Sequence, residues 1–331
     1  MKAIVHDTYG DADVLRHEDV DRPEPGAGEV RIRVHASSVN PLDWHFMTGT
    51  PWFLRLMAGL RRPKDRRRGV DVAGVVDAVG PDVTELAVDD RVAGATSGAF
   101  AEWAIGRPKN VTKVSDELAR FDDGELASIG VAGVTAIQGL RDHARLQPGQ
   151  RVLVNGAAGG VGTYTVQLAR AMGAHVTGVC SDRNVEMVSS LGADEVVDYT
   201  AGDAVERLST MEPFDVYIDN VGSHSISTCR RLLAPGGVFV MISGPKKNRL
   251  WGPVGRMIAM RLRFLFDSRR FVMFTAVETA DEIRTLLGHL ESGDIRPVID
   301  RRYPLSDTPE AMRYLGTGHA RAKVVIDVLT P

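Results

Sequence analysis

The stretch Asn155-Gly156-Ala157-Ala158-Gly159-Gly160-Val161-Gly162 follows the apolar run RVLV at 151–154 and opens a helical pattern. A dinucleotide pyrophosphate requires close approach of bare backbone, and the free N–H groups and positive dipole end of a helix N-terminus stabilise it. Gly159, Gly160 and Gly162 supply that access, although their spacing is G-x-x-G-x-x-G rather than the usual G-x-G-x-x-G. A tight strand-to-helix turn is the alternative. Because a strand precedes the stretch and another follows the helix at the right distance, we interpret it as a dinucleotide-binding turn.

Strands and helices alternate around this turn from about Glu125 onward. Such repetition is typical of right-handed strand–helix–strand units and a parallel sheet covered on both faces, so we predict a doubly wound domain over 125–299. Its predicted helices are 125–144, 160–173, 183–192, 204–211, 224–237 and 280–294, and its predicted strands are 151–156, 174–180, 194–199, 214–222 and 237–244. From Trp251 to Phe274 the chain is basic and apolar together, and the pattern loosens.

Residues 1–124 contain short strand patterns broken by turns, which predicts a β-rich domain. The main runs are KAIVH (2–6), EVRIRVHASSV (29–39), VAGVVDAVG (72–80), DRVAGA (90–95) and AFAEWAI (99–105). Near the C-terminus, a helix pattern at 302–318 and a strand pattern at 322–329 could return to this domain. Two domains fit a length of 331 residues at about 150 residues per domain.

Composition and charge exclude several classes of protein. With 44% hydrophobic and 25% charged residues, the chain has an ordinary globular composition. Its net charge of −3 gives no global attraction to nucleic acid, and no apolar run is long enough to span a bilayer. The N-terminus carries no recognisable export or organelle signal, so we expect a cytoplasmic location. The two cysteines, Cys180 and Cys229, lie in apparent core segments and cannot form a zinc lobe or a disulfide framework.

The coenzyme preference is expected to depend on Ser181-Asp182-Arg183, which follows the strand pattern at 174–180. An enzyme that selects NAD places a carboxylate here for the ribose hydroxyls, whereas one that selects NADP offers a cation and hydroxyls to the 2′-phosphate. Ser181 and Arg183, with Tyr199 at the end of the next strand pattern, favour NADPH. The alternative is that Asp182 is the ribose ligand and Arg183 is merely solvated.

Two further segments end predicted parallel strands, Asn220-Val221-Gly222 and Ser243-Gly244. Since ligands bind outside the carboxyl ends of such strands, we expect both segments to edge the nicotinamide. Ordinary loops are the alternative for each.

In the β-rich domain, Pro41 is expected to fix a turn that displays polar side chains beside Trp44. We hypothesise that Asn40, Asp43 and His45 form a polar wall of the substrate cleft. The alternative is that Asn40 and Asp43 satisfy loop backbone while Trp44 belongs to the core. The basic loop at 61–68 is interpreted as a solvated surface segment, with contact to an anion, a partner or nucleic acid as the alternative.

Several segments, taken in order, resemble the medium-chain dehydrogenase/reductase superfamily. They are SSVNPLDW (37–44), GVDVAGVVDAVG (69–80), VAGVTAIQGL (131–140), NGAAGGVGTYTVQLARAMGAHVTGVCS (155–181), LGADEVVDY (191–199), GDIRPVID (293–300) and GHARAKVVIDV (318–328). Within the superfamily, the chain is most similar to the zinc-free NADPH quinone oxidoreductase branch, including its reticulon-interacting-protein-like members. The resemblance covers nearly the whole chain.

The resemblance implies an α/β protein in which a GroES-like catalytic domain, 1–124 with 300–331, accompanies a Rossmann NADP-binding domain, 125–299. The active site is then expected in the cleft between these domains, and relatives suggest a homodimer. The residues expected to contact NADPH are Thr135, Ala158, Gly159, Gly160, Val161, Ser181, Arg183, Tyr199, Asn220, Gly244, Met273 to Thr275, His319, Ala320 and Arg321. The last segment reads HARAK where HARGK is usual, so Ala322 replaces a glycine.

The chain departs from the zinc alcohol dehydrogenases at the ligand positions. The places that carry their catalytic zinc ligands read Asp43, Val70-Asp71 and about Val131, and the four-cysteine lobe is missing from the sequence. These residues include neither an imidazole nor a thiolate, so they do not match a tetrahedral catalytic zinc site, and we expect no metal.

The expected reaction is hydride transfer from NADPH to a quinone or an α,β-unsaturated carbonyl, because no Lewis acid is available to activate an alcohol. Asn40 is the first candidate to hydrogen-bond the developing oxygen anion, with Asp43 and His45 as candidates for orientation or proton relay. The competing hypothesis is an NADPH-binding structural, regulatory or adaptor protein with vestigial catalysis.

Overall fold

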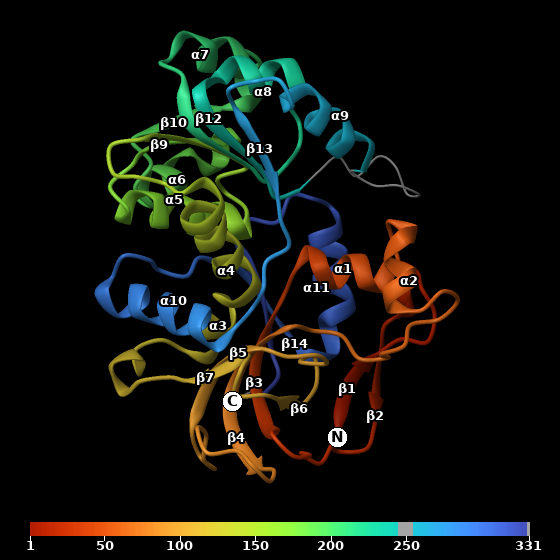
Figure 1. Ribbon diagram of the computed structural model, residues 1–331. Helices are drawn as coiled ribbons and strands as arrows, with labels where there is room; N and C mark the ends of the chain where they lie inside the picture. The colour runs from red at the N-terminus through yellow and green to blue at the C-terminus, as the bar shows by residue number, and fades with distance from the viewer. Residues whose placement is uncertain (244–253, 330–331) are drawn as a thin grey trace. The chain divides into compact units, whose positions relative to one another are not determined.

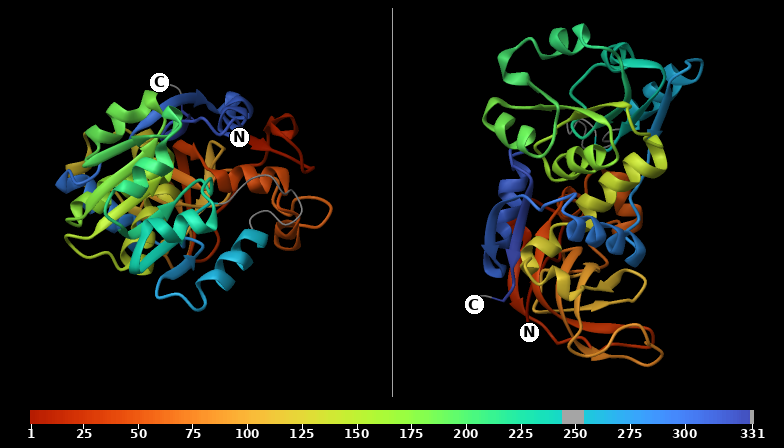
Figure 2. Two further views of the ribbon diagram at one scale, coloured as in Figure 1. Left: turned by 90° about the horizontal axis from the view of Figure 1, so that it is seen from above. Right: turned by 90° about the vertical axis from the view of Figure 1, so that its left-hand side faces the viewer.

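The computed structural model describes residues 1–243 and 254–329, which form two compact units (Figure 1). One unit comprises Met1–Val134 and Val277–Pro331, and we call it the β-rich unit. The other comprises Thr135–Ala276, and we call it the Rossmann unit. Both the N-terminal and the C-terminal strands belong to the β-rich unit, as the two views in Figure 2 show.

The β-rich unit is built on a seven-stranded sheet of order β14-β15-β3-β4-β5-β7, in which β6 also pairs with β3. These strands are β3 (Val30–Val39), β4 (Asp71–Val79), β5 (Arg91–Ala95), β6 (Trp103–Gly106), β7 (Val111–Lys113), β14 (Ile299–Pro304) and β15 (Lys323–Asp327), while β1 (Lys2–Val5) and β2 (Arg16–Asp19) form a separate pair. β15 lies antiparallel to β3, with Val324 opposite Val39. The expected return of the C-terminal strand to the first domain is therefore confirmed.

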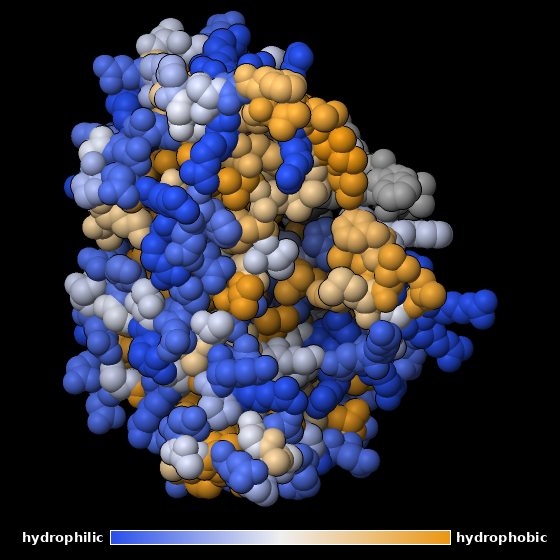
Figure 3. Space-filling model, viewed as in Figure 1, coloured by the Kyte–Doolittle hydropathy of each residue, from blue (hydrophilic) through white to orange (hydrophobic). Residues whose placement is uncertain are grey.

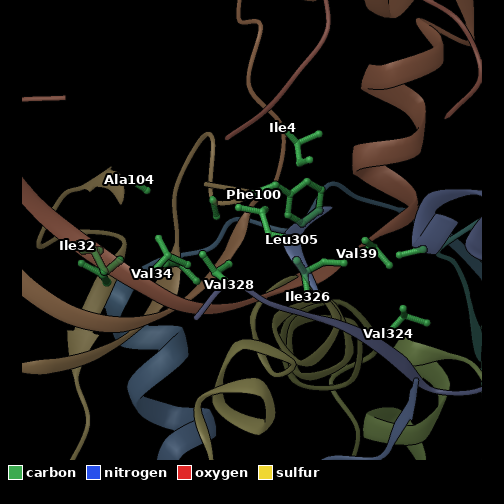
Figure 4. Packing of buried hydrophobic residues seen from close by; sticks show 14 of the residues in the cluster. Ile4, Ile32, Val34, Val39, Phe100, Ala104, Leu305, Val324, Ile326 and Val328 are labelled. Atoms are coloured by element: carbon green, nitrogen blue, oxygen red, sulfur yellow. The ribbon is translucent and has the colours of Figure 1, made fainter. Parts of the chain in front are cut away.

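Apolar side chains from distant parts of the chain form the core of this unit. Ile32 and Val34 of β3 and Ile326 of β15 are fully buried in one cluster, together with Phe100 and Leu305 (Figure 4). Burial of apolar surface stabilises the fold by roughly 25 cal/mol per Å² removed from water. Since β15 supplies part of this surface, the core requires the C-terminal strand.

The Rossmann unit contains a six-stranded, all-parallel sheet of order β10-β9-β8-β11-β12-β13. Its strands are β8 (Arg151–Asn155), β9 (His175–Cys180), β10 (Glu195–Asp198), β11 (Phe214–Asp219), β12 (Leu233–Met241) and β13 (Arg270–Met273). Helices α5 (Gly160–Ala171) and α6 (Val185–Ser190) lie on one side of the sheet, and α7 (Ala204–Thr210) and α8 (Ile226–Leu232) on the other (Figure 1). The strand order reverses between β8 and β11, so the predicted doubly wound fold is confirmed, and the reversal marks the ligand-binding edge.

Two predicted helices of this region differ from the structure, and one strand was not predicted. The helix expected over 125–144 is divided into α3 (Asp123–Ala127), α4 (Gly130–Gln138) and a π-helical end. The helix expected over 224–237 ends at Leu232, because Leu233 already pairs with β11. β13 was not predicted, since its four residues lie in the basic, apolar stretch whose pattern is loose.

The two units also divide the chain differently from the predicted domains. Residues 125–134 and 277–299, assigned by sequence to the Rossmann domain, belong to the β-rich unit. Helix α10 (Ala280–Ser292) begins where the Ala280 N–H donates to the Lys109 carbonyl, at 2.8 Å. The Asn110 side chain donates to the Glu278 carbonyl at 2.6 Å. These hydrogen bonds tie α10 to the segment just before β7, a long-range contact that periodicity does not reveal.

No helix within 1–243 and 254–329 is both long and apolar enough to cross a membrane.

Cys180 and Cys229 are buried and unpaired, and burial raises the pKa of both thiols, to about 11 and about 12.

Ala322 adopts the left-handed backbone conformation with φ of 45°. This conformation costs an L-residue with a Cβ about 1 kcal/mol, which glycine avoids. We therefore expect Ala322→Gly to raise the free energy of unfolding by roughly 0.5–1 kcal/mol in urea titrations. The matched control is Ala311→Gly inside helix α11 (Thr308–Gly316), which should lower it. A loss of stability in Ala322→Gly would contradict the strain.

Candidate coenzyme and active sites

The glycine-rich turn connects β8 to α5 and leaves the helix N-terminus bare. Gly156 has a φ of 75°, and a Cβ on Gly162 would lie 2.1 Å from the Gly156 carbonyl oxygen, so both glycines are needed to close the turn. Gly159 is the N-cap of α5, and no side chain caps the helix. A Cβ on Gly159 would meet only the Gly156 oxygen, at 3.5 Å, so the protein leaves this space open.

An open space beside a helix N-terminus fits a pyrophosphate. The first N–H groups of a helix have no intrahelical acceptor, and the helix dipole favours an anion there. Ala158, Gly159, Gly160 and Val161 lie in this turn or in the first residues of α5. The structure thus brings the four predicted residues together at a site with the chemistry that a dinucleotide requires, and their contact with the pyrophosphate remains a prediction.

The residues predicted to select the coenzyme gather at the ends of β9 and β10. Cys180 pairs with Asp198 in the parallel register, so Ser181 and Tyr199, the next residue of each strand, emerge at the same sheet edge. Arg183 and Tyr199 are exposed. The Asp198 carboxylate accepts the N–H and hydroxyl of Thr200, at 2.8 and 2.6 Å. The structure thus brings the ends of these two strands to one sheet edge, and the contact of Ser181, Arg183 and Tyr199 with a 2′-phosphate remains a prediction.

Asn220 comes directly after β11, the strand that pairs with β8 at the point where the strand order reverses. Its backbone N–H and its side-chain Nδ2 each donate to the Asn155 carbonyl, at 3.1 Å. Its Oδ1 is buried, and no residue that the structure describes donates to it. An orphaned acceptor at this edge fits an amide N–H of a ligand.

The remaining predicted coenzyme contacts belong to several elements of both units. Thr135 is nearly buried in α4, Met273 ends β13, and Thr275 is exposed two residues later. Gly244 lies outside the described residues. His319, Ala320 and Arg321 belong to the β-rich unit and lie between α11 and β15, where the Arg321 N–H donates to Asp300 Oδ2 at 2.9 Å. Closure of this segment over the coenzyme remains a prediction.

The expected turn around Pro41 is wrong, because residues Pro41–Thr48 form helix α1. A proline at the first helical position suits a helix, since its missing N–H would have no partner there. Asn40 is the N-cap, and Asp43 Oδ2 accepts the Asn40 N–H at 2.9 Å. The second Asp43 oxygen accepts the Gly69 N–H at 3.2 Å. Asp43 thus satisfies backbone, as the alternative interpretation held.

The predicted polar wall is largely buried. Asn40 and Asp43 are each only 2% exposed, so neither is displayed on a surface of the unit. His45 is partly buried, and its Nδ1 donates to the Thr50 carbonyl at 2.7 Å, which leaves Nε2 as its other ring nitrogen.

The Asn40 side chain belongs to a buried polar cluster with Ser38, Asp71 and Lys323. Its Nδ2 donates to Asp71 Oδ2 at 2.8 Å and to the Ser38 carbonyl at 3.2 Å. Its Oδ1 accepts from Lys323 Nζ at 2.7 Å, and the same Nζ donates to Asp71 Oδ2 at 3.1 Å. The Ser38 hydroxyl also donates to Asp71. We call Ser38, Asn40, Asp71 and Lys323 the Asn40 cluster.

Lys323 was not predicted as a site residue. It is the first residue of β15, and its side chain is 3% exposed while that of Asp71 is fully buried. Lysine is almost never fully buried without a partner. The only signal in the sequence was a lysine directly before the apolar run VVIDVL, which is equally typical of an exposed strand end.

Burial, followed by the negative charge of Asp71, raises the pKa of Asp43 from 3.8 to about 7. The Asn40 N–H, Lys323 and Arg68 oppose this shift by favouring the ionised form. Burial is the larger cause, because Asp43 lies in a medium that solvates charge poorly, and Asp71 adds a second negative charge beside it.

Comparisons with known proteins agree with this architecture. Residues 26–116 match the alcohol dehydrogenase GroES-like domain, and residues 191–326 match the zinc-binding dehydrogenase model. The chain is 32% identical to the chloroplast envelope quinone oxidoreductase homolog of Arabidopsis thaliana, over 99% of this chain and 98% of that protein. It is 33% identical to the mitochondrial NAD(P)H oxidoreductase RTN4IP1 of Mus musculus, over 99% and 89% respectively.

The chain belongs to the medium-chain dehydrogenase/reductase superfamily. The quinone oxidoreductase of Coxiella burnetii has a similar solved structure, with a TM-score of 0.86 and 28% identity, covering 99% of each chain. The predicted superfamily, its quinone oxidoreductase-like relatives and the α/β fold with GroES-like and Rossmann parts are thus confirmed. Like these relatives, this medium-chain dehydrogenase/reductase is an oxidoreductase that uses NAD(P)H.

A raised pKa has a definite consequence for stability. Between about pH 4 and pH 7, folded Asp43 holds a proton that the unfolded chain has released, so its contribution to stability falls as pH rises. We expect the free energy of unfolding of the wild type, relative to Asp43→Asn, to fall by something on the order of 2 kcal/mol from pH 5 to pH 8. Urea titrations of both proteins measure this. A difference that is constant with pH, or grows, would contradict the assignment.

Proposed function

We propose that this protein transfers hydride from NADPH to a quinone or an α,β-unsaturated carbonyl without a zinc ion. The observation that carries the proposal is the bare N-terminus of α5, which fits a pyrophosphate, in a chain whose other unit holds the buried Asn40 cluster. The chloroplast and mitochondrial relatives, a quinone oxidoreductase homolog and an NAD(P)H oxidoreductase, support the reaction class.

The bound coenzyme would supply a hydride from C4 of its nicotinamide. When hydride adds to an electron-poor carbon, negative charge develops on the conjugated oxygen, and a hydrogen-bond donor there lowers the barrier. We assign this donor to Asn40 Nδ2. Its 3.2 Å bond to the Ser38 carbonyl is longer than its 2.8 Å bond to Asp71, so the Ser38 bond is the one to be exchanged for a substrate oxygen.

Asp43 and His45 have supporting roles in this proposal. Asp43 fixes the start of α1 and thereby the Asn40 backbone. His45, whose Nδ1 donates to the Thr50 carbonyl at 2.7 Å, is a further candidate to orient the substrate or to relay a proton.

The donor set of the β-rich unit supports a zinc-independent reaction. Asp71 Oδ2 already accepts from Ser38, Asn40 and Lys323, and Oδ1 accepts the Val131 N–H at 2.8 Å. A zinc site requires about three protein ligands, usually imidazole or thiolate, arranged around one point. Here the Lys323 ammonium group, 3.1 Å from Asp71 Oδ2, neutralises the carboxylate.

We propose that Ser181, Arg183 and Tyr199 make the protein bind NADPH in preference to NADH. Arg183→Ala should weaken binding of NADPH about 10- to 100-fold and leave NADH nearly unchanged, because only NADPH carries the 2′-phosphate. Equilibrium titration by nicotinamide fluorescence measures both constants. Asp182→Ala is the matched control, since it tests the competing ribose ligand. Equal losses for both coenzymes in Arg183→Ala, or a loss of NADH binding in Asp182→Ala, would contradict the assignment.

A direct test of function is NADPH consumption with a panel of quinones and enals. We expect turnover of at least one acceptor class, and an undiminished rate after incubation with a zinc chelator. A folded, NADPH-binding preparation that reduces none of them would contradict the proposal.

The second candidate is an NADPH-binding adaptor, and exposed apolar side chains favour it. Between 52 and 60, before the basic loop at 61–68, the exposed large apolar residues are Trp52, Phe53, Leu56, Met57 and Leu60. On and after α9 (Val254–Phe264) the exposed large apolar residues are Ile258, Leu262, Leu265 and Phe266. Orange areas over α2 (Arg55–Ala58) and α9 are visible in Figure 3. Such patches are typical of partner surfaces. The absence of turnover in the acceptor panel would favour this candidate.

A cytoplasmic location and a homodimer remain part of the proposal. The relatives from Arabidopsis thaliana and Mus musculus are named as chloroplast and mitochondrial proteins, respectively.

A further inference from the structure

The reaction described above gives Lys323, a member of the Asn40 cluster, no task. Its ammonium group is buried, donates to Asn40 Oδ1 at 2.7 Å and contacts Asp71 Oδ2 at 3.1 Å. Removing two charges from water is costly, and replacing a buried ion pair by apolar side chains of similar volume is often neutral or stabilising. Stability alone therefore does not account for this pair.

The pair determines which way the Asn40 amide faces. A lysine ammonium can only donate hydrogen bonds, and an ionised aspartate can only accept them. In the observed orientation, Asn40 Oδ1 faces Lys323 and Nδ2 faces Asp71. A flipped amide would bring Nδ2 against the ammonium group and Oδ1 against the carboxylate, losing both hydrogen bonds. Lys323 and Asp71 together thus permit a single orientation.

We propose that Lys323 is a positioning residue, which holds Asn40 Oδ1 so that the Asn40 Nδ2–H donates to the substrate oxygen on which charge develops. This inference rests on the proposed function. The ammonium also withdraws electron density from the amide through Oδ1, which makes Nδ2–H a stronger donor, and hydrogen bonds in such chains reinforce one another. Lys323 transfers no proton: hydride forms the new C–H bond, the electron pair moves to oxygen, and water protonates the product anion.

The location of the cluster supports this role. Lys323 comes from β15, Asn40 precedes α1, and Asp71 begins β4, so three separate segments fix the amide. A group held by several segments is preorganised, which is what a donor to a transition state requires. The contacts lie within one compact unit and do not depend on the coenzyme.

The test compares Lys323→Met with the double variant Lys323→Met/Asp71→Asn. The single variant leaves a buried carboxylate without its cation, which should lower both the melting temperature and kcat. The double variant removes both charges, so its melting temperature should return to near that of the wild type. We expect kcat in the double variant to remain about 10- to 100-fold below wild type, with NADPH affinity unchanged, because the amide has lost its donor at Oδ1.

Lys2→Met, at an exposed surface pair with Asp19, is the matched control and should keep wild-type kcat. Recovery of both melting temperature and kcat in the double variant would overturn the inference, since the pair would then be structural only. Full kcat in Lys323→Met would overturn it as well. If the single variant fails to fold, the double variant decides alone. If a folded wild type shows no turnover, both the proposed function and this inference are overturned. If the wild type turns over substrate and the double variant has the same kcat, only this inference is overturned.

Discussion

The antiparallel pairing of β15 with β3 is the constraint on which the β-rich unit depends. It places Val324 opposite Val39, and so brings Lys323 to Asn40 although the two are 283 residues apart in the sequence. The buried side chains along both strands hold this register, because a slip of one residue would turn every apolar side chain to the opposite face. The position of the buried ammonium is thus a consequence of the apolar packing along these two strands.

The Rossmann unit depends on a different constraint, which is the parallel alignment of its strands. There the parallel strands align their carboxyl ends at one edge, and helix α5 starts at that edge without a side-chain cap. The glycine-rich turn therefore offers a ligand mostly backbone and open space, and the proposed selection of NADPH falls to a few side chains such as Arg183. In the β-rich unit, by contrast, the candidate catalytic group is a buried amide whose direction is fixed by charges.

The sequence allowed the backbone of the glycine-rich turn to be predicted better than the surroundings of Asn40. Glycines at a strand-to-helix junction report a local backbone requirement, so Gly159 and Gly162 could be interpreted without knowing the tertiary fold. The helix after Pro41 was missed because proline signals a turn and a helix start equally well. Lys323 was missed because its burial depends on a partner strand far away in the sequence. The π-helical end of the segment 125–144 and the assignment of α10 to the β-rich unit also depend on tertiary contacts. Asp71 was noticed only as a position without a zinc ligand, whereas its acceptor role becomes visible once β4 and β15 are placed.

A crystal structure of the protein grown with NADPH and excess Zn²⁺, with anomalous data collected at the zinc edge, tests the central claim most directly. The account predicts pyrophosphate density on the N–H groups at the start of α5, with Lys323 Nζ between Asn40 and Asp71 and no anomalous peak there. A zinc peak beside Asp71 and Asp43, or an empty glycine turn in crystals that contain the coenzyme elsewhere, would contradict it.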